Sequence, residues 1–199
     1  MKQQLIETQV FNLSNIIREG KYQGNPMVEG ILATVEQQNG NGRYYSKPLW
    51  EREIQKYIDG PVKENRALGE LDHADDEIIH LQKASHIIRD IWWDGSNVMG
   101  KIEILPTPMG KILITLLENN VMVGVSSRGM GSVQQMGELL EVQDDFELVC
   151  FDFVSTPSNH NSWMHPVKGT INENKQFNPN LVNKYISVNK ILNHIIHSL

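Results

Sequence analysis

The sequence contains very little cysteine, and Cys150 is its single thiol. One cysteine cannot form an internal disulfide, which excludes a disulfide-stapled scaffold and fits a reducing compartment. No apolar run approaches the ~20 residues that a membrane-spanning helix needs, and the start, MKQQLIETQV, lacks the apolar core of a signal peptide. We therefore expect a soluble, intracellular protein with no membrane partner.

Positive charge is also scarce. The chain has 18 Lys and Arg against 24 Asp and Glu, a net charge of −6, and no basic run stands out. Proteins that bind nucleic acid usually present a basic surface to the phosphates. Nucleic acid is therefore not the expected partner.

The rest of the composition is ordinary for a globular protein. The chain has 199 residues, of which 40% are hydrophobic and 21% charged, enough for one domain with a substantial core. Apolar spacing, caps and turn signals predict the following elements: a strand at 29–37, a helix from Ser46 to about 59–61, a hairpin across 85–105, a helix from Thr107, a strand at 121–123 that leads to Ser126, and a buried strand at 146–154. This alternation predicts an α+β domain built around a β-barrel or a strongly curved sheet.

The C-terminal part differs in composition. We expect a domain over residues 1–166, a polar, turn-rich linker over 167–180, and an amphipathic helix over 181–199. That helix would either pack on its own domain or bind a partner.

Residues 124–132, GVSSRGMGS, are unusual directly after an apolar run. An unpaired buried hydroxyl costs about 1–3 kcal/mol, so two adjacent serines need partners there. The stretch is compatible with an ordinary turn, a phosphate-binding loop or a nucleophile presented at a strand end. It lacks the Walker lysine and the full dinucleotide fingerprint, which disfavours the phosphate-binding loop.

Three residues have the chemistry of a catalytic triad. Ser126 needs a base, because a neutral hydroxyl is a weak nucleophile. Among seven histidines, His73 stands apart because it closes LGELDH beside several carboxylates, one of which could orient it. Asp152 lies within the apolar VCFDFV, and a buried carboxylate needs a partner such as an imidazole N–H. The less favoured alternative is a metal site formed by His73, Asp75, Asp76 and His80.

Six motifs taken in order resemble the prohead core proteases of tailed phages: LGELDH, SHII, WWDG, GKIEIL…TPMGK, GVSSRGMGSV and FDFVSTPS. The resemblance runs from about Gly30 to Ser158. It implies an assemblin-like β-barrel with surrounding helices, like the herpesvirus maturation protease, and a serine endopeptidase activity. Ser126 then matches the family's nucleophile and His73 its histidine.

The third catalytic member is less well defined by the resemblance. Assemblin-like enzymes have a histidine on the strand after the nucleophile, and Asp152 occupies the comparable place here. Glu70 and Asp72 are its rivals. The candidates for substrate binding or oxyanion stabilisation are Ser127, Arg128 and Gly129. Ser127 is expected to support a turn, and Arg128 is as compatible with a structural ion pair.

Gly129 and Gly131 are expected to let the backbone turn tightly after the serines. No cofactor and no metal are implied by the motifs or by the resemblance.

The resemblance further implies cleavage after a glutamate that has Leu or Ile two residues earlier. LIE at 5–7 and INE at 171–173 are the copies expected to be exposed, so we predict self-processing at Glu7 or Glu173. Cleavage at Glu173 would release the C-terminal helix. The expected substrates are phage scaffold, core and capsid proteins inside the assembling prohead, in the host bacterial cytoplasm, and a homo-oligomer is compatible with this role. The alternatives are an inactive structural barrel of a phage particle, such as a tube component, and a binding module.

Overall fold

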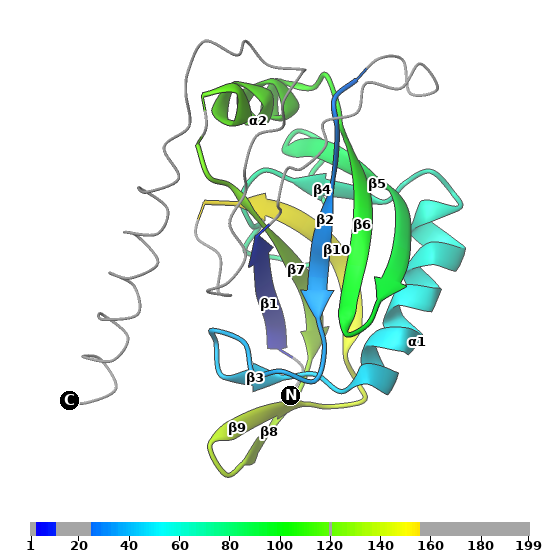
Figure 1. Cartoon of the computed structure of the whole chain (residues 1–199), viewed down its shortest axis with the longest axis vertical. Coiled ribbons are helices and arrows are strands. Elements are labelled where there is room, and N and C mark those ends of the chain that lie inside the picture. Colours follow the sequence, from blue (N-terminus) through cyan, green and yellow to red (C-terminus); the bar gives the residue numbers. More distant parts are fainter. Residues whose placement is uncertain (1–2, 11–24, 120, 156–199) are drawn as a thin grey trace, which may run out of the picture.

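Two antiparallel sheets form the body of the computed structural model, which describes residues 3–10, 25–119 and 121–155 (Figure 1). The first sheet has the strand order β1 (Gln3–Val10), β7 (Gly124–Gly131), β10 (Glu147–Val154). The second has the order β2 (Met27–Thr34), β6 (Asn97–Ile104), β5 (Ala84–Asp94), β4 (Leu68–Glu70). A smaller third sheet contains β3 (Arg43–Tyr44), β9 (Leu139–Val142) and β8 (Val133–Met136), with β3 and β9 parallel.

The two larger sheets meet where the chain leaves β4. Leu71 forms a parallel bridge with Phe153, and the Asp72 amide donates to the Phe153 carbonyl at 2.8 Å. The mixture of sheets and helices confirms the expected α+β class. Within the described ranges the ladders form three sheets and do not close into one barrel, so the assemblin-like barrel stays a prediction.

The helices begin where the sequence places their caps. Ser46 Oγ accepts from the Leu49 amide at 3.4 Å and starts α1 (Lys47–Tyr57), which continues as a π-helical turn, η2 (Ile58–Val62). Thr107 Oγ1 accepts from the Gly110 amide at 3.1 Å and starts α2 (Pro108–Glu118). None of the helices in the described ranges is long and apolar enough to span a membrane.

An aromatic cluster holds α1 against the first sheet. The Trp50 ring lies 5.9 Å from that of Phe146 and 6.2 Å from that of Phe151, and Tyr57 meets Phe151 edge-on at 5.7 Å. Such pairs add about 0.5–1.5 kcal/mol each beyond the burial of their area. The cluster therefore fixes β10, the strand that carries Asp152, against the core.

The structure corrects the prediction for residues 121–131. The predicted strand at 121–123 is absent, and GVSSRGMG is itself the strand β7, with Ser126 inside it and not at its end. The expected turn at Gly129 and Gly131 was wrong, since neither has a positive φ. A Cβ on Gly129 would lie 2.5 Å from Phe146 Cε2 and 2.7 Å from the Glu147 carbonyl oxygen, so this glycine allows close packing.

The N-terminal strand was also not predicted. LIE at 5–7 was expected to be exposed, but it lies in β1, which pairs with β7 along its length, and Leu5 is 1% exposed in the core. The expected exposure was therefore wrong for Leu5. The proposed linker 167–180, the helix 181–199 and Glu173 lie outside the described residues and stay predictions.

Candidate active site

The pairing of β7 with β10 brings Ser126 next to Asp152. The two residues are directly opposite each other in the antiparallel ladder, and opposed side chains share one face of a sheet. Arg128, two residues along β7, shares that face, whereas Ser127 belongs to the other. All four residues are buried.

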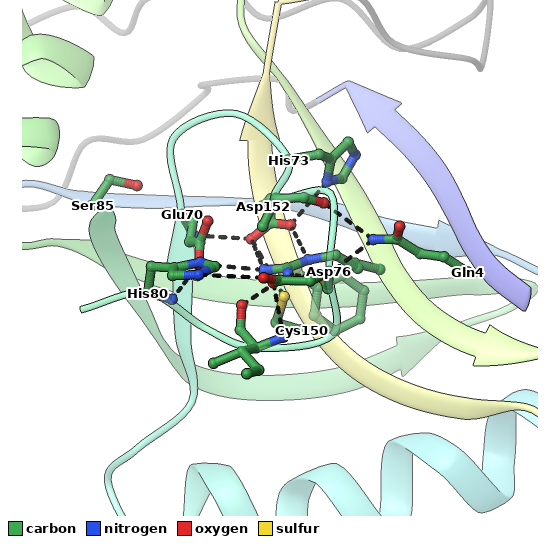
Figure 2. Close-up of polar contacts among 12 residues, drawn as sticks. Gln4, Glu70, His73, Asp76, His80, Ser85, Cys150 and Asp152 are labelled. Atoms are coloured by element: carbon green, nitrogen blue, oxygen red, sulfur yellow. Dashed lines mark hydrogen bonds and ion pairs between the residues drawn. The ribbon is translucent and has the colours of Figure 1, made fainter. Parts of the chain in front are cut away.

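Asp152 is the centre of the polar contacts (Figure 2). Its Oδ2 atom lies 2.9 Å from His73 Nδ1 and 2.9 Å from Arg128 Nε, and its Oδ1 atom accepts from the Glu70 amide at 2.9 Å and from Cys150 Sγ at 3.3 Å. Burial by itself raises the pKa of this carboxyl. The His73 hydrogen bond and the Arg128 charge outweigh burial, and the pKa is lowered from its usual value. Asp152 is therefore a buried anion at neutral pH.

The contact with Asp152 fixes how the His73 ring can act. A carboxylate only accepts hydrogen bonds, so Nδ1 carries the proton and Nε2 of a neutral ring carries the lone pair. Nε2 is buried and has no hydrogen-bond partner among the described residues. The side chain as a whole is 18% exposed. The imidazole is therefore oriented at one nitrogen and available as a base at the other.

The loop that carries His73, residues 71–83 between β4 and β5, is bonded to two strands of the first sheet. From β7, Arg128 Nη1 donates to the carbonyls of Asp76 at 2.7 Å and Ile78 at 3.1 Å. From β1, Gln4 Nε2 donates to the carbonyls of Ala74 at 3.1 Å and Asp76 at 3.3 Å. Sequence reasoning did not find Gln4, because it depends on a strand that was not predicted.

The rival carboxylates make other contacts. Glu70 is buried, accepts from the backbone N–H of His80 and lies 3.6 Å from Arg128 Nη2. Asp72 has a left-handed backbone, with φ of 67°. Among the described residues neither forms a hydrogen bond or ion pair with the His73 ring, whereas Asp152 does.

The structure thus brings together Ser126, His73 and Asp152 from three separate parts of the chain. Arg128 is fully buried and bonded to its neighbours, which favours the ion-pair interpretation over contact with a substrate. Ser127 faces away from this group and lies opposite Glu7 of β1 in the ladder. In the described part of the chain no three His, Cys, Asp or Glu residues are placed to bind a metal, so the metal alternative has no support there.

Comparison with known proteins gives consistent results. The family model described as prohead core protein serine protease matches residues 8–175. A prohead core protein protease of Enterobacteria phage T4 is 31% identical over 165 residues, covering 81% of this chain and 78% of the relative. A solved structure of the bacteriophage T4 capsid assembly protease superposes with a TM-score of 0.72 at 30% identity, covering 78% of this chain and 99% of that one. By its sequence and by its fold, this chain belongs to the prohead core protein protease family.

Proposed function

We propose that this protease is a serine endopeptidase in which Ser126 is the nucleophile, His73 the general base and Asp152 the orienting acid. The observation that carries the proposal is the 2.9 Å contact between His73 Nδ1 and Asp152 Oδ2, with Ser126 directly opposite Asp152 in the sheet. Nucleophile, base and acid are recognised by this kind of geometry and not by their order in the chain.

The reaction would follow from the state of the imidazole. His73 Nε2 takes the Ser126 proton while Oγ attacks the carbonyl carbon of the scissile peptide bond, and Asp152 stabilises the imidazolium. His73 then gives the proton to the leaving amine. A water molecule, deprotonated by the same nitrogen, hydrolyses the acyl-enzyme and releases Ser126. Ser127 and Gly129 are proposed for substrate binding or oxyanion stabilisation from the sequence alone, since this role needs N–H donors directed at the developing negative charge.

The proposed substrates are scaffold, core and capsid proteins of the prohead, in keeping with the relatives' names. We also propose a preference for glutamate before the scissile bond and self-processing. Cleavage at Glu7 is proposed from the LIE sequence, and it would require β1 to leave β7, because Glu7 and Thr8 are paired with Ser127 and Ser126 in the ladder. Cleavage at Glu173 is proposed from the INE sequence alone.

The first test is a time course of intact mass. The wild-type chain, the Ser126→Ala and His73→Ala variants, and Ser127→Ala as the matched control are expressed and incubated in parallel. Alanine at position 127 keeps the backbone N–H and removes only the hydroxyl, which lies on the opposite face of β7 from Ser126, so cleavage should stay intact. We expect loss of a piece ending at Glu7 or beginning after Glu173 in the wild type and in Ser127→Ala only.

Cleavage that persists in Ser126→Ala would refute the assignment of the nucleophile. If all four proteins keep a constant mass and the wild type also fails to cleave a capsid-core substrate, the inactive structural barrel would be favoured instead.

A further inference from the structure

Arg128 joins the three parts of the proposed site. Its side chain is fully buried on β7, two residues beyond Ser126. Toward β10, Nε lies 2.9 Å from Asp152 Oδ2 and Nη2 lies 3.4 Å from Oδ1. Toward the 71–83 loop, Nη1 donates to the carbonyls of Asp76 and Ile78, at 2.7 and 3.1 Å. Its Nη2 atom also lies 3.6 Å from Glu70 Oε1 on β4.

Through these contacts the rigid, planar guanidinium of Arg128 separates the 71–83 loop from the sheet by a fixed distance. His73 lies three residues before Asp76 on that loop, while Ser126 and Asp152 lie on the sheet. The position of the imidazole relative to Ser126 therefore depends on where the loop sits above β7. A guanidinium bonded at both ends fixes that distance, because its donors have a fixed fork geometry that an ammonium group lacks.

We infer that Arg128 is a positioning residue: it holds the 71–83 loop at the distance from β7 at which His73 and Asp152 can act on Ser126. This inference rests on the proposed function. It assigns Arg128 no contact with the substrate, because the guanidinium is fully buried and directed at Asp152, Glu70 and the two loop carbonyls. The competing explanation is an ion pair that stabilises the fold and leaves the reaction unaffected.

The test uses variants that keep the buried charge balanced. Removing Arg128 alone leaves the Asp152 and Glu70 carboxylates uncompensated, so the main variant combines Arg128→Met with Glu70→Gln. Arg128→Lys keeps the positive charge and loses the planar arrangement of N–H donors. Arg89→Met combined with Glu103→Gln is the matched control, because Arg89 forms a partly buried pair with Glu103 at 2.6 Å in the second sheet, away from the site.

Two measurements are made on each variant that unfolds cooperatively. The first is kcat and KM on a fluorogenic peptide carrying residues 3–12 of this chain. The second is amide hydrogen exchange of the 71–83 loop. We expect both Arg128 variants to lose about a hundredfold in kcat, the effect of a misplacement of about 1 Å, with KM changed by less than about threefold. Loop exchange should accelerate in both, and the Arg89 control should match the wild type in both measurements.

A folded Arg128 variant that keeps wild-type kcat and wild-type loop protection would overturn the inference. A loss confined to KM would overturn it as well, since it would indicate contact with the substrate. Failure of the proposed function has a different signature: the wild type and Ser126→Ala would behave alike toward the peptide. In that case the loop exchange of the Arg128 variants still decides whether this residue holds the loop.

Discussion

Acid should destabilise this protein through His86, which lies on β5 and is fully buried. His86 Nε2 lies 2.9 Å from the Phe151 carbonyl oxygen, and Nδ1 lies 2.8 Å from Ser85 Oγ. A carbonyl only accepts, so Nε2 carries the proton and the Ser85 hydroxyl donates to Nδ1. The neutral ring is thus fully hydrogen-bonded, and protonation would put a second N–H against the hydroxyl.

Burial lowers the pKa of His86 to about 4, against the opposing effects of the Asp152 charge and the bond to the Phe151 carbonyl. In the unfolded chain a histidine titrates near pH 6.5, so the unfolded state takes up this proton first. The contribution of neutral His86 to the free energy of unfolding is therefore fully present above about pH 6.5 and is lost as the pH falls toward about 4. A difference of roughly 2.5 pKa units corresponds to about 3 kcal/mol at the lower end of that window.

The assay compares urea unfolding of the wild type and His86→Gln at several pH values between about 7 and 4.5. The glutamine amide keeps a donor for the Phe151 carbonyl and does not titrate. All other ionisable groups are shared, so their effects cancel in the difference. We expect His86→Gln to be the less stable protein at neutral pH. The difference in unfolding free energy between the two proteins should shrink by about 2–3 kcal/mol on acidification. Parallel curves for the two proteins across this window would refute the reasoning.

Two further predictions concern the site strands. Asp152→Asn should lower kcat by about a thousandfold or more, because the amide no longer selects the His73 tautomer. It should also lower the free energy of unfolding by about 3–5 kcal/mol, because the buried Arg128 loses its compensating charge. Cleavage assays and urea unfolding measure the two effects, and wild-type values of both would contradict the proposed site. Gly129→Ala should destabilise by about 1–3 kcal/mol because its methyl group would meet the Phe146 ring and a backbone carbonyl. Gly131→Ala, whose Cβ would lie 3.0 Å or more from its neighbours, should cost less, and equal unfolding midpoints for the two alanine variants would contradict this packing argument.

The parts of the fold that the sequence predicted depend on local chemistry. Ser46 and Thr107 are caps with a proline in the turn that follows, Pro48 at the second helical position of α1 and Pro108 at the first of α2, and both helices begin there. The pairing of Asp152 with a histidine followed from the cost of a lone buried carboxylate. His73 could be selected because its motif placed it beside carboxylates.

The parts that it missed depend on contacts between distant segments. Glycine and serine have low strand propensity, so GVSSRGMG looks like a turn until β1 and β10 pair with it on either side. The role of Gly129 is set by the ring of Phe146, which no local pattern reveals. Arg128 was open to two interpretations for the same reason: its burial is a property of the assembled sheet and not of its neighbours in sequence.

The order of strands in the first sheet also sets when the enzyme can exist during its own synthesis. Ser126 lies on the middle strand, and Asp152 lies on β10, which ends at Val154 as the last described strand. A nascent chain that has not yet emerged past β10 carries Ser126 and His73 without the group that orients the imidazole. Translation proceeds from the N-terminus at about 5–20 residues per second, so the chain up to Val154 takes roughly 8–30 seconds to synthesise before the site can assemble. The proposed site can therefore assemble only after residues 147–154 have been synthesised and have paired with β7.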